Sequence, residues 1–324
     1  MSDAGQSGRI PVAVIGCGVF GRHHARIYRE LPNADLVGVY DTDAARAAEV
    51  AREFGTRAFG SLEEAAAAAR AATVAAPTAA HEAVTLALLE RGLDVLVEKP
   101  IANTLAAADR MIAAAERHGQ LLMVGHLERY NPAVQLVRAR LTRPLFFEVH
   151  RLSLFTPRSL DVDVLLDLMI HDLDIVLSFV QAPIRDLQAV GLAVLSRHTD
   201  IANVRLTFAN GCVANLTASR VSTEKVRKLR FFQPGEYISL DYARRDAARF
   251  AVAPGGGPQG LTIGHEHLQG EDREPLAAEI AAFLEGVATR RQPEPDGKAA
   301  RAALAAALRA AEAIAQHREE LQLS

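Results

Sequence analysis

The sequence has little cysteine, no tryptophan, no long apolar run and no excess of basic residues. Two cysteines among 324 residues exclude a disulfide framework and a cysteine-rich zinc fold. No apolar run reaches the length of about 18 residues that a membrane-spanning helix needs. The opening residues, MSDAGQSGR, contain no apolar core of a signal peptide. A formal net charge of −3 disfavours a protein that binds nucleic acid through a basic face. We therefore expect a cytoplasmic protein that binds neither membranes nor nucleic acid.

Lysine is scarce as well, with 4 lysines against 32 arginines. Lys99 is the single lysine of the first 224 residues. Arginine stays charged at all physiological pH values, whereas a partly buried lysine can lose its proton near neutral pH. The use of lysine at this one position therefore indicates a chemical role for Lys99. The alternative is a surface salt bridge between Lys99 and Glu98.

The first 125 residues alternate between short apolar runs and alanine-rich amphipathic stretches. This alternation is typical of βαβ units, so it predicts a doubly wound parallel sheet, the Rossmann type of α/β fold. Residues 1–125 are accordingly expected to form a dinucleotide-binding domain. The expected strands are Ile10–Ile15, Asp35–Tyr40, Thr73–Ala76, Leu93–Val97 and Leu121–Val124.

The pattern changes after Gly125. A helical segment is expected at Leu165–Val180, and strand-like segments follow between Ile184 and Ile263. Turn residues such as Asn210-Gly211 separate them, so we expect an antiparallel meander covered by one helix. Residues 126–324 are thus expected to form an α+β domain with a largely antiparallel open sheet, for substrate binding and oligomerisation. The two C-terminal helices of this stretch could instead pack on the first domain.

A glycine-rich turn follows the first strand directly. Gly16, Gly18 and Gly21 form the pattern G-x-G-x-x-G, with Val19 and Phe20 between the last two glycines. In a βαβ unit these glycines give a tight turn, a close approach of the backbone to a pyrophosphate, and close packing of helix on strand. The helix N-terminus then offers N–H groups to the anion. The context predicts dinucleotide binding, and the alternative is a turn without a ligand.

Asp41 lies 20 residues beyond Gly21, at the end of the second strand. A carboxylate at this position accepts hydrogen bonds from the ribose hydroxyls of NAD and repels the 2′-phosphate of NADP. The next residues, Thr42-Asp43-Ala44, contain no arginine to hold that phosphate. We therefore expect NAD rather than NADP as the cofactor.

Further polar residues stand where the other strands end. Glu98-Lys99-Pro100 closes the strand Leu93–Val97, and Pro77-Thr78 closes the strand before it, with His81 one helical turn later. The carboxyl ends of parallel strands line the ligand crevice, so these residues are expected beside the cofactor. His81 has packing or capping as an equal alternative, and the isomer of the Lys99-Pro100 bond is left open.

Asp167 and His171 lie four residues apart on the helix expected at Leu165–Val180, so they share one face. Histidine is the usual proton acceptor near neutral pH. Spacing alone also fits a histidine packed on the sheet and hydrogen-bonded to Asp167. We expect no metal site here, because no third ligand is apparent nearby.

The segment after the last Rossmann strand is rich in polar groups. Such groups suit contacts with hydroxyl, amide and phosphate groups of a substrate, and the alternative is a plain domain linker. Arg158 adds a further candidate anion contact. The basic stretch Arg220–Arg230 is interpreted as a solvated strand edge, and the segment around His265 and His267 as a surface loop. The candidate substrate-binding residues are His126, Arg129, Tyr130, Asn131 and Arg158.

Four motifs in order along the chain resemble those of the Gfo/Idh/MocA oxidoreductases. They are the glycine turn, the Pro-Thr-x-x-His of Pro77–His81, the Glu-Lys-Pro of Glu98–Pro100 and the Asp-x-x-x-His of Asp167–His171. The resemblance covers nearly the whole chain. It implies that Lys99 lies by the nicotinamide and the reacting carbon, and that Asp167 and His171 act in substrate binding and catalysis. The chain departs from the family at Met169, where glycine is usual.

Two longer stretches, GHLERYNPAV and DVDVLLDLMIHDLDIV, resemble the branch of this family that oxidises the sugar 3-hydroxyl of UDP-N-acetylglucosamine. The 3-keto product can be converted by an aminotransferase to a 3-amino sugar of the lipid A type. Arg129 and Arg158 are then candidates for the diphosphate. The related uronate is the runner-up substrate, followed by inositol or another sugar.

The resemblance also implies a homodimer or homotetramer that pairs through the C-terminal sheet. An alternative function outside the class of enzymes is a redox sensor that binds NAD without turnover. Such a protein would not need Lys99, Asp167 and His171 together, and their joint presence favours an enzyme.

Overall fold

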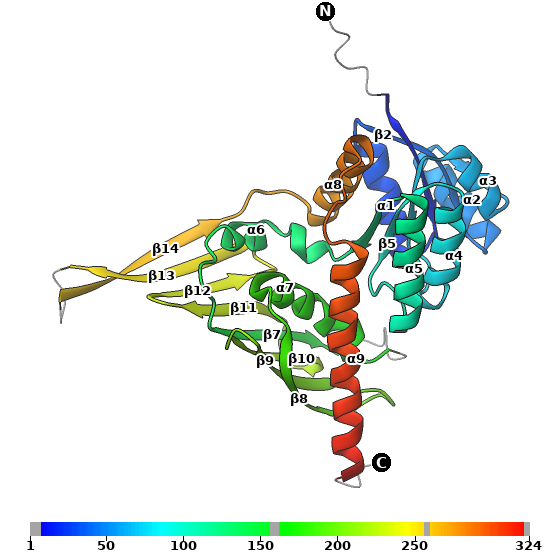
Figure 1. Ribbon diagram of the computed structural model, residues 1–324. Coiled ribbons are helices and arrows are strands. Elements are labelled where there is room, and N and C mark those ends of the chain that lie inside the picture. The colour runs from blue at the N-terminus through cyan, green and yellow to red at the C-terminus, as the bar shows by residue number, and fades with distance from the viewer. Residues whose placement is uncertain (1–7, 156–161, 256–259, 321–324) are drawn as a thin grey trace, which may run out of the picture. The chain divides into compact units, whose positions relative to one another are not determined.

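The computed structural model describes residues 8–155, 162–255 and 260–320. The chain divides into two compact units (Figure 1). The first unit contains the chain up to Leu127 together with Glu274–Arg301, and the second contains Glu128–Arg273 and the residues from Ala302 onward. The segment Glu274–Arg301 thus groups with the first unit, although a division of the sequence at residue 125 leaves it in the second domain.

The first unit is built on a six-stranded, wholly parallel sheet with the order β3-β2-β1-β4-β5-β6. This order confirms the expected Rossmann fold. The strand order reverses between β1 and β4, which is the point where such sheets bind ligands outside their carboxyl ends. The strands are β1 (Ile10–Ile15), β2 (Ala34–Tyr40), β3 (Arg57–Ala58), β4 (Ala71–Val74), β5 (Asp94–Glu98) and β6 (Leu122–Gly125).

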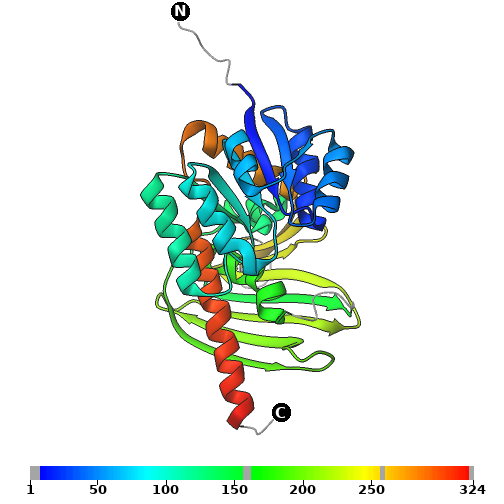
Figure 2. The same cartoon turned by 90° about the vertical axis from the view of Figure 1, so that its right-hand side faces the viewer.

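Helices pack around this sheet (Figure 2), and their ends follow from local chemistry. The Ser61 hydroxyl accepts a hydrogen bond from the Glu64 N–H at 3.2 Å and begins α3. Gly119, with φ 64°, ends α5 in the left-handed conformation that glycine adopts easily. The helices of this unit are α1 (Val19–Glu30), α2 (Ala44–Phe54), α3 (Leu62–Ala68), α4 (Thr78–Glu90), α5 (Leu105–His118) and α8 (Pro275–Thr289).

The second unit contains an eight-stranded sheet with the order β14-β13-β12-β11-β7-β10-β9-β8. Its pairs are antiparallel except for β7 with β10, which run parallel. The expected largely antiparallel sheet is confirmed. The strands are β7 (Phe146–Leu154), β8 (Ile184–Leu192), β9 (Ile201–Phe208), β10 (Val213–Ser222), β11 (Val226–Gln233), β12 (Glu236–Asp241), β13 (Asp246–Pro254) and β14 (Leu261–Gln269).

Two details of that sheet differ from the expectation. The single meander is wrong, because β7 lies between β10 and β11 and separates two meanders. The long connection through a helix between β7 and β8 permits this parallel pairing. His265 and His267 are exposed as expected, but they belong to β14 rather than to a loop.

Several helices cover one face of the sheet, where one was expected. They are α6 (Pro132–Arg138), α7 (Ile170–Val180) and the part of α9 (Gly297–Glu320) that belongs to this unit. Val137, Phe179 and Ile314 from these helices share one apolar core with the sheet residues Phe147 and Phe231. Alternate residues of each strand therefore point into this core, and the others lie on an open face.

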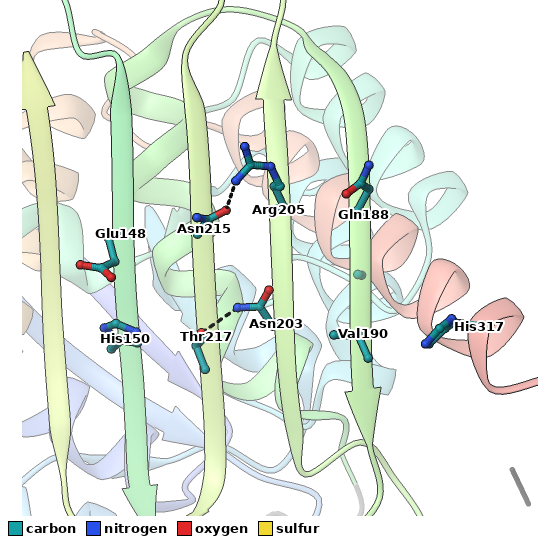
Figure 3. Close-up of a pocket in the computed structure, with 10 residues that line it drawn as sticks. Glu148, His150, Gln188, Val190, Asn203, Arg205, Asn215, Thr217 and His317 are labelled. Carbon is teal, nitrogen blue, oxygen red and sulfur yellow. Dashed lines mark hydrogen bonds between the residues drawn. The ribbon is translucent and has the colours of Figure 1, made fainter. Parts of the chain in front are cut away.

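The opposite face of the sheet is polar over β7 to β10 (Figure 3). Asn203 donates to the Thr217 hydroxyl and Arg205 donates to Oδ1 of the Asn215 side chain, each at 2.9 Å. These side chains line a hollow of about 520 Å³. This hollow lies on the open face of the second unit and contains none of the residues expected to carry the chemistry.

The segment before α7 departs from a regular α-helix. Leu165–Met169 forms a π-helical turn, η2, in which the Ile170 N–H bonds to the Leu165 carbonyl five residues earlier. The expectation of one α-helix over Leu165–Val180 is therefore wrong for the first turn. The apolar residues of this turn fit the period of a π-helix as well as that of an α-helix, so the sequence could not distinguish the two. π-turns are rare and occur frequently at functional sites. A short 3₁₀ turn, η1 (Leu127–Tyr130), precedes α6.

Candidate active site

The candidate residues fall into two groups, one in each unit, and each group is described by itself. In the first unit the glycine turn joins β1 to α1. A Cβ on Gly21 would lie 1.8 Å from the Gly16 carbonyl oxygen, and one on Gly16 would lie 2.6 Å from the Ala75 backbone. A Cβ on Gly18 would meet nothing within 4 Å. Gly16 and Gly21 are thus required by packing, whereas Gly18 leaves open space above the turn.

The start of α1 fits a pyrophosphate. Gly18 is its N-cap and offers no side chain to bond the first N–H groups of the helix. Val19 and Phe20 in the first turn are 69% and 47% exposed, which is unusual for large apolar side chains beside a core. Open space, N–H donors and apolar walls at one place match the requirements of a bound dinucleotide.

Asp41 lies just beyond β2 with both carboxylate oxygens fixed. Oδ2 accepts from the Cys17 N–H at 2.7 Å and Oδ1 from the Asp43 N–H at 2.8 Å. Arg46 Nη1 lies 3.6 Å from Asp41 Oδ2, so an arginine is close to Asp41 although Thr42-Asp43-Ala44 contain none. Arg46 stands five residues later in the sequence, and the first turn of α2 places its side chain next to Asp41. Burial, together with the charge of Asp41, raises the pKa of Cys17 to about 12.

His81 joins the ends of two neighbouring strands. It is buried, with Nε2 2.9 Å from the Ala76 carbonyl and Nδ1 3.0 Å from the Pro100 carbonyl. Burial lowers the pKa of His81, and a neutral ring can donate to one of these two carbonyls. Pro77 caps α4 and Thr78 begins it. These contacts match the packing role that the sequence left open for His81.

Lys99 follows β5 on a turn that contains a cis Lys99-Pro100 bond. Its N–H donates to Glu98 Oε2 at 3.3 Å, and Glu98 Oε1 lies 2.8 Å from His24 Nε2. Both side chains of this ion pair are buried. The surface salt bridge considered for Glu98 and Lys99 is therefore wrong, because the carboxylate is buried against α1.

The pair with His24 determines the charge of Glu98. Burial works to raise the pKa of Glu98, but the hydrogen bond and charge of His24 outweigh it, and the pKa is lowered. A Cβ on Gly125 would lie 3.1 Å from the Glu98 carboxyl group, so glycine leaves room for it. Sequence reasoning missed His24, although it stands three residues after Gly21 on the same helical face. His126 follows Gly125 and is buried, with its N–H bonded to the Val124 carbonyl at 2.8 Å.

In the second unit a buried charge cluster joins η1, β7 and α7. Arg151 donates to Asp172 from Nε at 2.7 Å and Nη2 at 2.9 Å, and to Glu128 from Nη1 at 3.1 Å. Its guanidinium carbon lies 5.0 Å from the centre of the Tyr242 ring. Each carboxylate is thereby compensated in the interior, as burial of a charge requires.

Two predicted substrate residues are bonded inside this layer. Arg129 donates to Asp174 from Nε at 2.7 Å and Nη2 at 2.6 Å, and both side chains are buried. Asn131 caps α6 and donates to Glu128 and to the Tyr242 carbonyl, each at 3.1 Å. These contacts hold η1 and α6 in place, and the substrate-binding role of Arg129 and Asn131 stays a prediction.

The remaining candidates are more accessible. Tyr130 on η1, Asp167 on η2 and His171 in the first turn of α7 are each half-buried. Arg158 lies outside the described residues. Within the described part of the chain, no group of three or more histidine, cysteine and carboxylate side chains is placed to hold a metal ion. In the same part, no helix has the length and apolarity to cross a bilayer.

Comparison with known proteins places these features in a family. Residues 10–126 match the family described as an oxidoreductase family with an NAD-binding Rossmann fold, and residues 133–233 match the GFO/IDH/MocA C-terminal domain. The chain belongs to the Gfo/Idh/MocA family of oxidoreductases. It is accordingly an NAD-dependent dehydrogenase.

Individual members of the family differ in how similar they are to this chain. The chain is 40% identical to UDP-N-acetylglucosamine 3-dehydrogenase of Acidithiobacillus ferrooxidans, over 93% of this chain and 96% of that protein. A solved structure of that enzyme matches with a TM-score of 0.90 and 39% identity, over 95% of this chain and 98% of the other. An inositol 2-dehydrogenase of Acidothermus cellulolyticus is 31% identical over 56% of each chain.

The contrast between two glycines gives a first test of the dinucleotide site. Gly18→Ala should fold with an unchanged melting temperature, because its Cβ meets nothing within 4 Å, and should weaken NAD binding about tenfold or more by blocking the pyrophosphate. Gly21→Ala should instead lower the melting temperature, because its Cβ collides with backbone. Calorimetry of unfolding and of NAD binding measures both. Unchanged NAD affinity in Gly18→Ala would contradict the site.

Asp41 and Arg46 give a second test. Asp41→Ala should weaken NAD binding and improve NADP binding, because the repulsive carboxylate is removed and Arg46 remains to bind a 2′-phosphate. The double variant Asp41→Ala/Arg46→Ala is the matched control and should lose the gain in NADP binding. Titration of both cofactors gives the ratio of affinities. A ratio that stays at the wild-type value in Asp41→Ala would refute the ribose contact.

Proposed function

We propose that this protein oxidises the sugar 3-hydroxyl of UDP-N-acetylglucosamine to the 3-keto nucleotide sugar, with NAD as the oxidant. The observation that carries the proposal is the 40% identity to an enzyme of that name over nearly the full length of both chains. The keto product would feed an aminotransferase that makes a 3-amino sugar of the lipid A type, in the cytoplasm.

The oxidation breaks the C3–H bond and the O–H bond of the sugar, and the proposal assigns an acceptor to the hydride and another to the proton. NAD, when bound, accepts the hydride from C3 of the sugar. His171 takes the hydroxyl proton as general base, and Asp167 orients the histidine. The Lys99 ammonium donates to the sugar oxygen as it gains negative charge, which lowers the energy of the transition state. The residues up to 125 hold the cofactor in this proposal, and those from 126 onward bind the sugar nucleotide.

The cofactor contacts in this proposal use residues at the strand ends of the first unit. Gly18 and the start of α1 face the pyrophosphate, and Asp41 accepts from the ribose hydroxyls. Glu98 positions Lys99 beside the cofactor by accepting its backbone N–H. His81 positions the same turn through its contact with the Pro100 carbonyl. The full proposed set is Gly16, Gly18, Val19, Phe20, Gly21, Asp41, Pro77, Thr78, His81, Glu98 and Lys99.

Turnover with a panel of substrates tests the proposal. Protein and NAD should produce a sustained rise in NADH absorbance with UDP-N-acetylglucosamine, when an aminotransferase and glutamate remove the ketone. A rise only with UDP-N-acetylglucosaminuronate or with inositol would replace the proposed substrate. NAD binding without turnover of any sugar would indicate the redox sensor.

Substitution of the proposed acid–base groups tests the mechanism. Lys99→Ala and His171→Ala should each lower kcat by about 10²- to 10⁴-fold, while NAD affinity stays close to that of the wild type. Lys298→Ala and His198→Ala are the matched controls, because both side chains are exposed, and should keep the wild-type kcat. A near-normal kcat in Lys99→Ala or His171→Ala would remove that residue from the mechanism.

We propose further that two copies of the chain pair through the open face of the sheet, as a homodimer or within a homotetramer. A row of stacked and tilted rings crosses this face from β7 to β14, with neighbouring ring centres 4.7 to 5.7 Å apart. Val252 and Ile263 stand opposite each other on the same side and are 50% and 71% exposed. A row of aromatic and apolar groups of this kind is typical of a protein interface. The ring-bearing residues are Phe146, Phe232, Tyr237, Phe250 and His265.

Sedimentation tests this assembly. The wild type should sediment as a dimer or larger species at micromolar concentration, and Ile263→Lys should shift it toward monomer, because the lysine charge would be buried in the interface. Thr262→Lys is the matched control on the opposite side of the exposed strand β14, and should keep the assembly. A monomeric wild type would contradict the proposal.

A further inference from the structure

Arg227 occupies an unusual place in the second unit. It is the second residue of β11 and lies directly opposite Arg151 of β7 in the antiparallel pair. Because residues alternate along a strand, Arg227 shares the helix-facing side with Leu229 and Phe231, which belong to the core. Its side chain is half-buried. The interpretation of Arg220–Arg230 as a solvated strand edge is therefore wrong at this position.

The other basic residues of the segment differ from Arg227. Arg220 is buried and donates to the Val162 carbonyl. Lys225 is exposed in the turn before β11. Lys228 and Arg230 point to the open face, where Arg230 donates to Glu148 at 2.9 Å. Arg227 thus carries the one charge of β11 that lies on the side of η2 and α7.

Arg227 differs from Arg151 in its bonding partners. Among the described residues, none lies within ion-pair distance of its guanidinium, and its buried Nε donates no hydrogen bond. The nearby carboxylates of Asp172 and Glu128 are both bonded by Arg151. Two like charges directly opposite each other on paired strands are destabilising. Burial and the charge of Arg151 accordingly lower the pKa of Arg227.

The surroundings of Arg227 connect it to the proposed chemistry. Asp167 on η2 lies close enough for its charge to act on Arg227. Asp167 is the carboxylate assigned to substrate binding and catalysis with His171. Arg129, which the sequence predicts to bind the diphosphate, donates to Asp174 from Nε and Nη2, and its role toward a substrate stays a prediction. Among the described residues, the guanidinium of Arg227 therefore has no bonded carboxylate, although it lies near the reactive Asp167. An anion from outside the chain would compensate its charge.

We propose that Arg227 binds the diphosphate of the nucleotide sugar, an inference that rests on the proposed function. A guanidinium donates two parallel hydrogen bonds to phosphate oxygens and neutralises their charge. The bound diphosphate gives the Arg227 guanidinium a negatively charged partner. Its charge also offsets the repulsion between Arg227 and Arg151. Arg227 thereby selects a sugar nucleotide over a free sugar.

Arg227→Gln tests the proposal, with Lys228→Gln as the matched control on the opposite side of the same strand. Arg227→Gln should raise the KM for UDP-N-acetylglucosamine by about tenfold to a hundredfold, as expected for the loss of hydrogen bonds from a charged donor. It should also abolish the rise in melting temperature that UDP or inorganic pyrophosphate gives the wild type. NAD affinity should not change. Lys228→Gln should match the wild type in all three measurements.

A second variant keeps the test valid if Arg227→Gln is unstable. Arg227→Lys retains the charge but loses the paired donors, so its KM should lie between those of the wild type and Arg227→Gln. A wild-type KM in both variants would overturn the proposal. An effect confined to the uronate, with UDP binding unchanged, would also overturn it, because the anion would then be the carboxylate.

The same measurements separate this proposal from the proposed function. Wild-type stabilisation by UDP that depends on Arg227, without turnover of UDP-N-acetylglucosamine, would support the anion site and reject the substrate. Turnover with a KM independent of Arg227 would support the substrate and reject the anion site. A wild type that neither binds UDP nor turns over the sugar nucleotide would reject both.

Discussion

The buried guanidinium of Arg151 is the contact on which the polar layer of the second unit depends. It holds Glu128 of η1 and Asp172 of α7 from a position on β7, so three elements distant in sequence share one charge network. Removing one member of such a network leaves an uncompensated buried charge, at a cost of about 3–5 kcal/mol. The same network uses the carboxylates that could have paired with Arg227. The bonds that stabilise this layer therefore also leave Arg227 without a bonded carboxylate among the described residues, which is the basis of the proposed anion site.

The first unit shows a related arrangement on a smaller scale. The buried pair of His24 and Glu98 connects α1 to the end of β5, and Glu98 accepts the N–H of Lys99. The glycine turn and Lys99 are thereby tied to the same helix. A single internal ion pair thus supports both the residues that suit the dinucleotide and the lysine assigned to the reacting oxygen.

Much of the fold followed from the sequence, because strong periodicity and the glycine turn are local signals. The doubly wound parallel sheet and the glycine turn between β1 and α1 are examples. The errors concern properties that depend on distant contacts. The place of β7 between β10 and β11, the π-turn before α7, and the pairing of His24 with Glu98 are determined by tertiary packing. A count of basic residues between Arg220 and Arg230 could not show which face of β11 each one occupies.

The central claim is that the hydride leaves carbon 3 of the sugar in UDP-N-acetylglucosamine. UDP-N-acetylglucosamine carrying deuterium at C3, incubated with the protein and NAD, tests this claim most directly. Mass spectrometry of the two products locates the label. The account predicts that deuterium appears on the reduced nicotinamide and that the keto sugar nucleotide has lost it. Reduced cofactor without deuterium, together with a labelled sugar product, would contradict the account.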